Sequence, residues 1–172
     1  MKSSRLVSFI ALMMLSTGAL AQSDAQKSFD RLKTLAGSWQ GTVTTTPPQE
    51  EVEGKTIHVS LRVTSMGNAL MHEANIAGRP DDPITMLYVD GDRLLLTHYC
   101  DAGNRPRMEG KMSVDGKTIE FTLVDIAGST QKGYMNRMAF TIVDANHHTE
   151  EGTYMFPGNK PMRASGEYTR TK

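Results

Sequence analysis

The sequence predicts an all-β protein: a closed antiparallel up-and-down barrel of about ten strands, preceded by a short N-terminal helix. Residues 57–63 and 119–123 alternate between apolar and polar side chains, which is the period of a strand with one buried face. Tight-turn signals separate such segments at Gly67-Asn68, Asp90-Gly91-Asp92 and Asp115-Gly116-Lys117. A long meander would leave two unpaired edge strands, and closing the sheet on itself removes both edges.

The first 21 residues predict a cleavable signal peptide. Two basic residues, Lys2 and Arg5, precede an apolar run at 6–15, and Ala19-Leu20-Ala21 supplies the small residues of a cleavage site. The run is too short to anchor the chain in a bilayer, and no cysteine follows it directly to carry a lipid. We therefore expect an exported protein, periplasmic or secreted and without a membrane anchor, whose mature chain is residues 22–172.

The mature chain predicts a single domain of 151 residues, which is long enough to bury a sizeable core. It contains 17 basic and 19 acidic residues, so its net charge is about −2, and charges of both signs are scattered along it. This distribution gives no basic stripe for nucleic acid and no basic cluster for an anionic membrane surface. Cys100 is the only cysteine, which excludes an internal disulfide.

The elements of the domain follow in a simple order. Residues 22–37 predict the helix and the turn into the first strand, because Asp24 can cap a helix whose Phe29, Leu32 and Leu35 share one face. No second helix of any length is predicted, which rules out a parallel βαβ arrangement. The predicted strands are Trp39–Thr46, Thr56–Met66, Ala69–Ala77, Ile84–Asp90, Arg93–Cys100, Arg105–Val114, Thr118–Ile126, Tyr134–Asp144, Thr149–Phe156 and Met162–Thr171.

The number of strands predicts a cavity inside the barrel. An eight-stranded barrel has an interior just sufficient for side chains or one small ligand, and the diameter grows with the number of strands. The mature chain also contains nine methionines, whose flexible thioethers would let a cavity accept several apolar shapes, although ordinary core filling explains them nearly as well. We therefore expect a small apolar or amphipathic molecule as the partner, and no cofactor.

The segment from Phe29 to Gly41 contains a Gly-x-Trp turn and resembles the opening of calycin-type barrels, in which a short helix leads into the first strand. The strand Leu96–Cys100 and the turn Gly103–Met108 resemble a recurring signature of exported bacterial proteins of unknown function with a nitrobindin-like or lipocalin-like fold. The resemblance implies that an arginine on the last strand, here Arg170, stacks on Trp39 and closes one end of the barrel. Such a cation–π contact contributes about 0.5–2 kcal/mol.

The chain departs from these families at the residues that hold their ligands. Nitrobindins bind haem through a histidine on a late strand, whereas His147 and His148 here fall in a predicted turn rather than in the barrel wall. Fatty-acid binders use two inward arginines and a tyrosine on the last strands, and Arg163, Tyr168 and Arg170 match that pattern only loosely. The resemblance therefore predicts the barrel more firmly than it predicts a ligand.

The strand that contains His98 is the predicted centre of a binding site. His98 and Cys100 share a face with Leu94 and Leu96, because alternate residues of a strand point the same way, and we expect this face to line the interior. His72 is expected to join them from another strand. A nucleophilic Cys–His dyad within one strand is disfavoured, because residues two apart lie roughly 6.6 Å from each other. A zinc site built from the same residues, or a buried histidine without a ligand, are the alternatives.

Four further polar residues are candidate ligand contacts. Tyr99 is a candidate polar contact, and Arg107 follows a turn at the barrel rim, where a guanidinium can bind a carboxylate or phosphate bidentately. Glu73 and Arg137 lie in mid-strand, where each is either a solvated outer residue or an inward charge that needs a partner. The predicted function is interior binding of a small, largely apolar ligand with one polar end, without an assigned catalytic residue or metal. A haem- or metal-dependent enzyme in the same cavity and a structural or interaction domain with a filled barrel are the alternatives.

Overall fold

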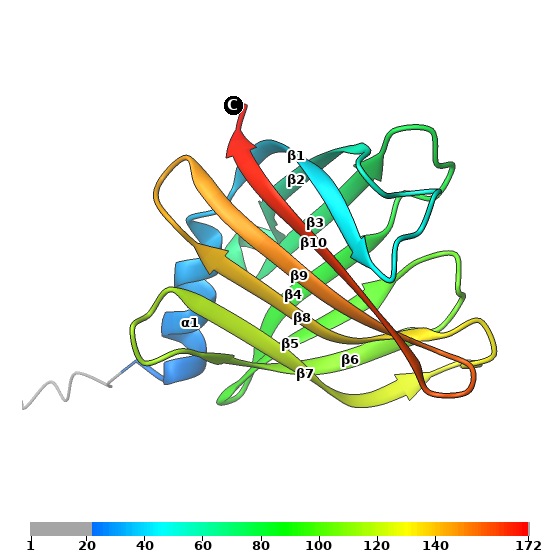
Figure 1. Cartoon of the computed structure of the whole chain (residues 1–172). Coiled ribbons are helices and arrows are strands. Elements are labelled where there is room, and N and C mark those ends of the chain that lie inside the picture. The colour runs from blue at the N-terminus through cyan, green and yellow to red at the C-terminus, as the bar shows by residue number, and fades with distance from the viewer. Residues whose placement is uncertain (1–21, 172) are drawn as a thin grey trace, which may run out of the picture.

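Ten antiparallel strands of the computed structural model close into a barrel, with one α-helix before the first strand (Figure 1). The structure describes residues 22–171, so the predicted signal peptide at 1–21 lies outside the described residues. The all-β fold class predicted from the sequence is confirmed. Within residues 22–171, no helix is both long and apolar enough to cross a membrane.

Hairpin turns and loops connect the elements along the chain. A short 3-10 turn, Ser65–Gly67, lies between the second and third strands. The helix and strands are α1 (Asp24–Lys33), β1 (Gly37–Thr46), β2 (Thr56–Thr64), β3 (Ala69–Ile76), β4 (Ile84–Asp90), β5 (Arg93–Tyr99), β6 (Arg105–Met112), β7 (Thr118–Ala127), β8 (Tyr134–Ile142), β9 (His147–Phe156) and β10 (Lys160–Arg170).

Each strand pairs with its neighbour in sequence, and the barrel closes where β1 meets β10. At this seam Trp39 lies opposite Arg170, and Val43 lies opposite Gly166. Because the pairing is continuous around the barrel, none of the ten strands within residues 22–171 has an open edge. Inward residues of all ten strands line the interior, and their apolar members form one core together with the apolar face of α1.

Helix α1 packs its apolar face against one end of the barrel. Phe29, Leu32 and Leu35 are buried and belong to the same core as the barrel interior, as their spacing predicts. The cap differs from the prediction: Ser23, rather than Asp24, is the N-cap, and its hydroxyl accepts a hydrogen bond from the Gln26 amide at 3.2 Å. Asp24 occupies the first turn, where a negative charge interacts favourably with the helix dipole.

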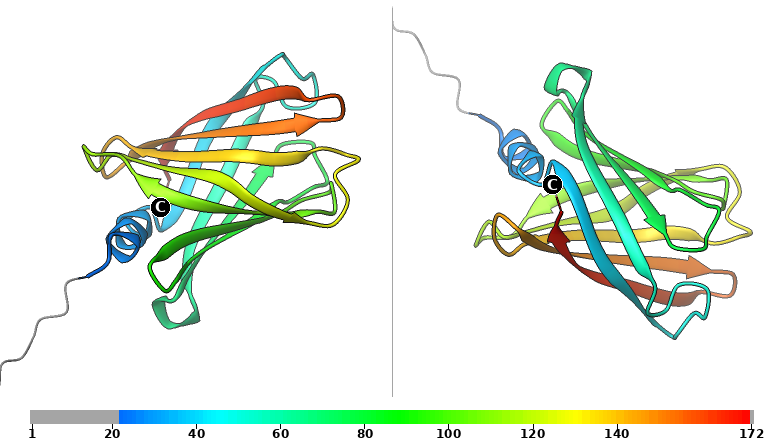
Figure 2. Two further views of the ribbon diagram at one scale, coloured as in Figure 1. Left: turned by 90° about the horizontal axis from the view of Figure 1, so that it is seen from below. Right: turned by 90° about the horizontal axis from the view of Figure 1, so that it is seen from above.

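The two ends of the barrel differ. At one end lie α1 and the C-terminus of the chain (Figures 1 and 2), and this is the closed end. Five connections surround the other, open end: 47–55, 77–83, 100–104, 128–133 and 157–159.

Six strand ends differ from the prediction by two residues, among them the ends of β2 and β6 and the start of β9. β2 stops at Thr64, because Ser65 and Met66 take positive φ angles of 51° and 54° and turn the chain away. β6 stops at Met112 rather than Val114, where the turn to β7 begins. β9 begins at His147, two residues before its predicted start, and this difference changes the composition of the interior.

Candidate functional site

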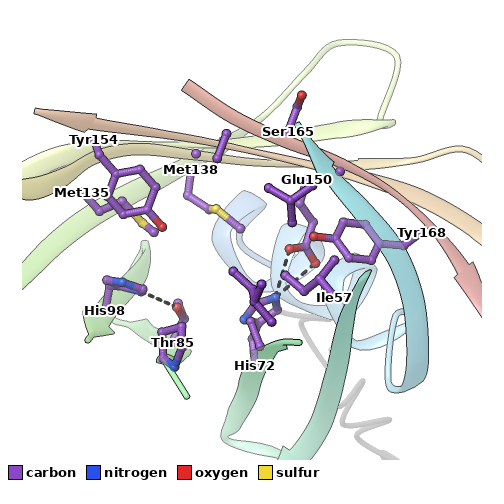
Figure 3. A pocket seen from close by; sticks show the side chains of 17 residues that line it. Ile57, His72, Thr85, His98, Met135, Met138, Glu150, Tyr154, Ser165 and Tyr168 are labelled. Carbon is purple, nitrogen blue, oxygen red and sulfur yellow. Dashed lines mark hydrogen bonds and ion pairs between the residues drawn. The ribbon is translucent and has the colours of Figure 1, made fainter. Parts of the chain in front are cut away.

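A cavity of about 100 Å³ lies inside the barrel, and an open vestibule of about 680 Å³ adjoins it among the loops of the open end. His98, Met135 and Tyr154 line both spaces, so the vestibule leads into the cavity. Most of the cavity wall is apolar. Seven residues with polar side chains line it: His72, Thr85, His98, Glu150, Tyr154, Ser165 and Tyr168 (Figure 3).

Glu150 joins two histidines at one side of the cavity. His72 Nε2 lies 3.1 Å from each carboxylate oxygen, and His148 Nε2 lies 3.0 Å from Oε1. All three side chains are buried, with Glu150, the most exposed of them, at 6 %. Because an ionised carboxylate only accepts hydrogen bonds, both imidazoles present Nε2–H to it.

The charges of this cluster are set by its members. Burial alone would raise the pKa of Glu150, but the charge of His72 and hydrogen bonds from His148 and His72 hold that pKa well below its usual range. Burial alone would lower the pKa of His72, but the charge and hydrogen bond of Glu150 raise it. Each partner therefore favours the ionised form of the other in an otherwise apolar part of the interior.

His148 is part of the barrel wall, which contradicts its predicted place in a turn. It is fully enclosed: its ring stacks on Tyr168 at 4.9 Å with an interplanar angle of 12°, and it meets the edge of Trp39 at 4.3 Å. His147 points to solvent and bonds to Asp144 in the turn at 2.9 Å. The two neighbouring histidines therefore lie on opposite faces of β9, as the alternation of a strand requires.

His98 provides a second polar position on the cavity wall. Its Nδ1 lies 2.9 Å from the Thr85 hydroxyl, and its Nε2 has no hydrogen-bond partner among residues 22–171. Burial, followed by the charge of His72, lowers the pKa of His98 to about 4. His98 is therefore neutral at neutral pH, whereas Glu150 favours the protonated form of His72.

On each of the neighbouring strands β9 and β10, the ring of a tyrosine covers the glycine that stands two residues before it. Gly152 precedes Tyr154 by two residues in β9, and Gly166 precedes Tyr168 by two residues in β10, so each pair shares the inner face. A Cβ atom at position 152 would lie 3.2 Å from the Tyr154 ring, and one at 166 would lie 2.7 Å from the Tyr168 hydroxyl. Each ring thus occupies the space that a side chain at the glycine would fill.

A β-bulge in β8 places two methionines in the cavity wall. The pairing of β8 with β9 shifts between Met135 and Arg137, which leaves Asn136 as an extra residue. Because a bulge interrupts strict alternation, Met135 and Met138 both face inward although they are three residues apart. Their thioethers give this wall a deformable apolar surface.

Two of the predicted ligand contacts near the rim lie outside the cavity. Tyr99 is 43 % exposed, because it has the opposite parity to His98 and points outward. Arg107 also faces outward, where it forms an ion pair with Asp125 on the neighbouring strand β7. Their predicted contact with an interior ligand is therefore wrong.

The two mid-strand charges also lie on the outer surface. Arg137 pairs with Glu120 at 2.6 Å and with Glu151 at 3.3 Å, across three neighbouring strands. Glu73 follows the inward His72 and lines a shallow groove on the outside of the barrel. Neither charge needs a partner inside the barrel, so these predicted ligand contacts are wrong for the same reason of parity.

The residues on the predicted inner face of β5 lie in two places, the barrel interior and the vestibule. His98, Leu94 and Leu96 are buried inside. Cys100, just beyond the end of β5, lines the vestibule and is partly buried. Burial raises the pKa of its thiol, which disfavours a reactive thiolate.

The two predicted closure residues are in contact at the closed end. The guanidinium carbon of Arg170 lies 4.0 Å from the centre of the Trp39 ring, and the indole N–H donates to the Leu35 carbonyl at 2.8 Å. The guanidinium also donates three hydrogen bonds to backbone carbonyls, at Thr34, Ala36 and Ala145. Arg170 thus joins α1, β1 and the turn between β8 and β9.

The interior does not fit a metal or haem site. Within residues 22–171, no three His, Cys, Asp or Glu side chains are grouped so that they could hold a metal ion. His148, on the late strand where the nitrobindin resemblance would place a haem ligand, has its Nε2 bonded to Glu150 and its ring packed between Trp39 and Tyr168.

Sequence reasoning missed Glu150, His148 and Tyr154 on the inner face of β9, and Thr85 in the cavity wall. The signal for the first three was present, because residues 148, 150, 152 and 154 share one parity and continue the inner face of β9. The predicted strand began at Thr149, and this later start hid His148. Nothing in the sequence marked Thr85, whose role depends on its position opposite His98 in the pairing of β4 and β5.

Comparisons with known proteins show the fold and leave the family open. No family model matches the sequence, and no curated protein is similar to it. The structure is similar to that of Rv2717c from M. tuberculosis, with a TM-score of 0.63 and 15 % sequence identity over 84 % of this chain and 98 % of that one. It is also similar to a protein of unknown function of the DUF3598 family from Nostoc punctiforme, with a TM-score of 0.54 and 9 % identity over 81 % of this chain and 49 % of that one. These similarities support the barrel fold, while the calycin and nitrobindin-like assignments stay predictions.

Proposed function

We propose that the barrel binds a small, largely apolar molecule in its interior, taken up through the open end. The observation that supports this most directly is the cavity of about 100 Å³, which adjoins a vestibule of about 680 Å³. Small-molecule sites in proteins are mainly apolar and carry a few polar groups that fix the orientation of the ligand. The cavity has this composition, with the methionines of β8 on one wall and polar groups from His98, Glu150 and the two tyrosines.

The dimensions indicate how a ligand would be divided between the two spaces. A cavity of about 150 Å³ is known to accept a benzene molecule, so a space of about 100 Å³ holds only a small group. The remainder of the ligand would lie in the vestibule, between Met135, Tyr154 and the loops of the open end. A ligand with a compact polar end and an apolar body fits this arrangement.

Native mass spectrometry of the purified protein, with analysis of its organic extract, tests the proposal. We expect one bound molecule per chain, released on denaturation. Ala164→Leu places a larger side chain on the inner face of β10 beside the cavity and should reduce occupancy, whereas Thr169→Leu on the outer face of the same strand should not. A protein that is empty after growth under all conditions, or equal occupancy in both variants, would contradict interior binding.

A further inference from the structure

We propose that the polar end of the ligand is an uncharged hydrogen-bond acceptor, such as a ketone or ester carbonyl, and that the hydroxyls of Tyr154 and Tyr168 bind it. This inference rests on the proposed function, because it assigns the chemistry of a ligand in the same cavity. It assigns two residues that sequence reasoning did not place in the site.

The first support is the position of the two hydroxyls. Both tyrosines line the cavity, and Figure 3 shows their rings reaching into it from the walls of β9 and β10. Gly152 and Gly166 leave the room in which the rings lie, so the strands place both phenols by the same local device. Neither hydroxyl hydrogen-bonds to another residue within 22–171, whereas Glu150 beside them already accepts from two imidazoles.

The second support is the type of hydrogen bond on offer. A phenol at neutral pH carries a proton that it can donate, and burial raises the pKa of both tyrosines, so both stay protonated. Tyr168 is buried and Tyr154 is half-buried, so both hydroxyls lie in a largely apolar space, and a carbonyl oxygen has two lone pairs with which to accept from one or both of them. A ligand that supplies this oxygen therefore satisfies groups that the protein itself leaves free.

The third support is the charge of the cavity, which favours a neutral ligand. An anionic end would meet the carboxylate of Glu150 without a free cation, since His72 is paired with Glu150 and His98 is neutral. The two arginines that could have bound an anion, Arg107 and Arg137, lie on the outside in ion pairs. A cationic end would have no free carboxylate to pair with. Glu150 holds the only buried carboxylate of the described residues, and both of its oxygens already accept a hydrogen bond from His72.

Three probes of similar shape separate these possibilities: ethylbenzene, acetophenone and benzoate. All three carry one benzene ring and a short substituent. The substituent is apolar in ethylbenzene, a neutral hydrogen-bond acceptor in acetophenone and an anion in benzoate. Titrations of the protein followed by NMR or calorimetry should give acetophenone the lowest Kd, about threefold to tenfold below that of ethylbenzene, which corresponds to the net contribution of one hydrogen bond. Benzoate should bind more weakly than both.

Variants assign the preference to the hydroxyls. Tyr154→Phe and Tyr168→Phe should each weaken acetophenone binding and leave ethylbenzene binding unchanged, which also shows that the variant is folded and its cavity intact. Tyr99→Phe is the matched control, because Tyr99 is exposed on the outer face. Equal Kd values for acetophenone and ethylbenzene, a lower Kd for benzoate, or an undiminished preference in both variants would overturn the inference while leaving interior binding intact. If none of the three probes binds and the purified protein also carries no molecule, the proposed function itself is contradicted.

Discussion

At the scale of single residues, the cavity contains two histidines whose surroundings have opposite effects. His72 lies against the carboxylate of Glu150, which favours its protonated form, whereas His98 lies against the hydroxyl of Thr85 and has no charged partner. Both are almost completely buried, so the difference in protonation comes from the partner rather than from exposure. The cavity wall is therefore charged at one position and neutral at the other.

The neutral state of His98 predicts a loss of stability in acid. Because burial lowers its folded pKa from 6.5 to about 4, the unfolded chain binds more protons than the folded one between these two values. The free energy of unfolding should therefore fall as pH decreases from 6.5 towards 4, by up to about 1.4 kcal/mol per pH unit for this one group. Above pH 6.5 the contribution of His98 is fully present and constant.

Comparison with His98→Gln isolates this effect, because the variant keeps the other titrating groups. His72, whose pKa is raised, contributes with the opposite sign: its stabilisation is present below pH 6.5 and is lost as pH rises through the raised value, in both proteins alike. Urea denaturation of both proteins from pH 4.5 to 8 should show curves that approach each other in acid. Parallel curves over this range would show that His98 is not held neutral.

At the scale of elements, β9 and β10 each place an aromatic ring over a glycine, and the two contacts differ in severity. Neither glycine has a positive φ angle, so alanine suits the backbone at both positions. At Gly166 the added carbon would lie within 2.8 Å of ring carbons of Tyr168, and that ring is held by its stack on His148. At Gly152 the corresponding distance to Tyr154 is 3.2 Å, which a small shift can relieve.

Alanine substitution should therefore have unequal effects at the two positions. Gly166→Ala should destabilise the fold by about 1–3 kcal/mol, the usual cost of overpacking. Gly152→Ala should change stability by less than about 1 kcal/mol, because a smaller clash opposes the gain of about 0.4–1 kcal/mol from a less flexible unfolded chain. Urea midpoints of the two variants measure the difference, and a larger loss for Gly152→Ala would contradict the contact described above.

The strands also show what the sequence could and could not predict. Alternation and turn residues gave all ten strands, because both signals are local. The inward position of His98 followed from parity with Leu94 and Leu96. Glu73 and Arg137 were placed on the wrong face. The sequence does not show whether a charged residue in mid-strand points inward or outward, because its ion-pair partners come from other strands. The carboxylate bridge of Glu150 depends on a contact between β3 and β9, which no local pattern contains.

At the scale of the whole molecule, the closed end depends on residues from both ends of the domain. Arg170 on the last strand covers the ring of Trp39 on the first strand and donates to carbonyls at the C-terminal end of α1. A cation at that position is favourable, because the last carbonyls of a helix carry partial negative charge. One side chain therefore fastens the helix, the seam of the barrel and a turn at the same end.

A double-mutant cycle tests this closure. Trp39→Ala should cost about 3–5 kcal/mol, because the ring is almost fully buried at 1 % exposure. The losses from Trp39→Ala and Arg170→Ala should add to more than the loss of the double variant, by the roughly 0.5–2 kcal/mol of the shared cation–π contact. Arg170→Lys, which keeps the charge but cannot donate to three carbonyls from one plane, should recover only part of the loss. Strict additivity in urea denaturation would mean that the two side chains do not interact.

The pairing of β1 with β10 also has a kinetic consequence. The other nine strand pairs are hairpins between sequence neighbours, whereas this pair brings together segments that are separated by most of the domain. Its formation therefore has the largest entropic cost of loop closure of any strand pair in the sheet. The meander can therefore form before the barrel closes. Trp39 is the only tryptophan of the chain and lies in this seam, beneath Arg170 and against His148. Its fluorescence in a refolding experiment consequently reports the moment of closure, while far-ultraviolet circular dichroism reports the hairpins that precede it.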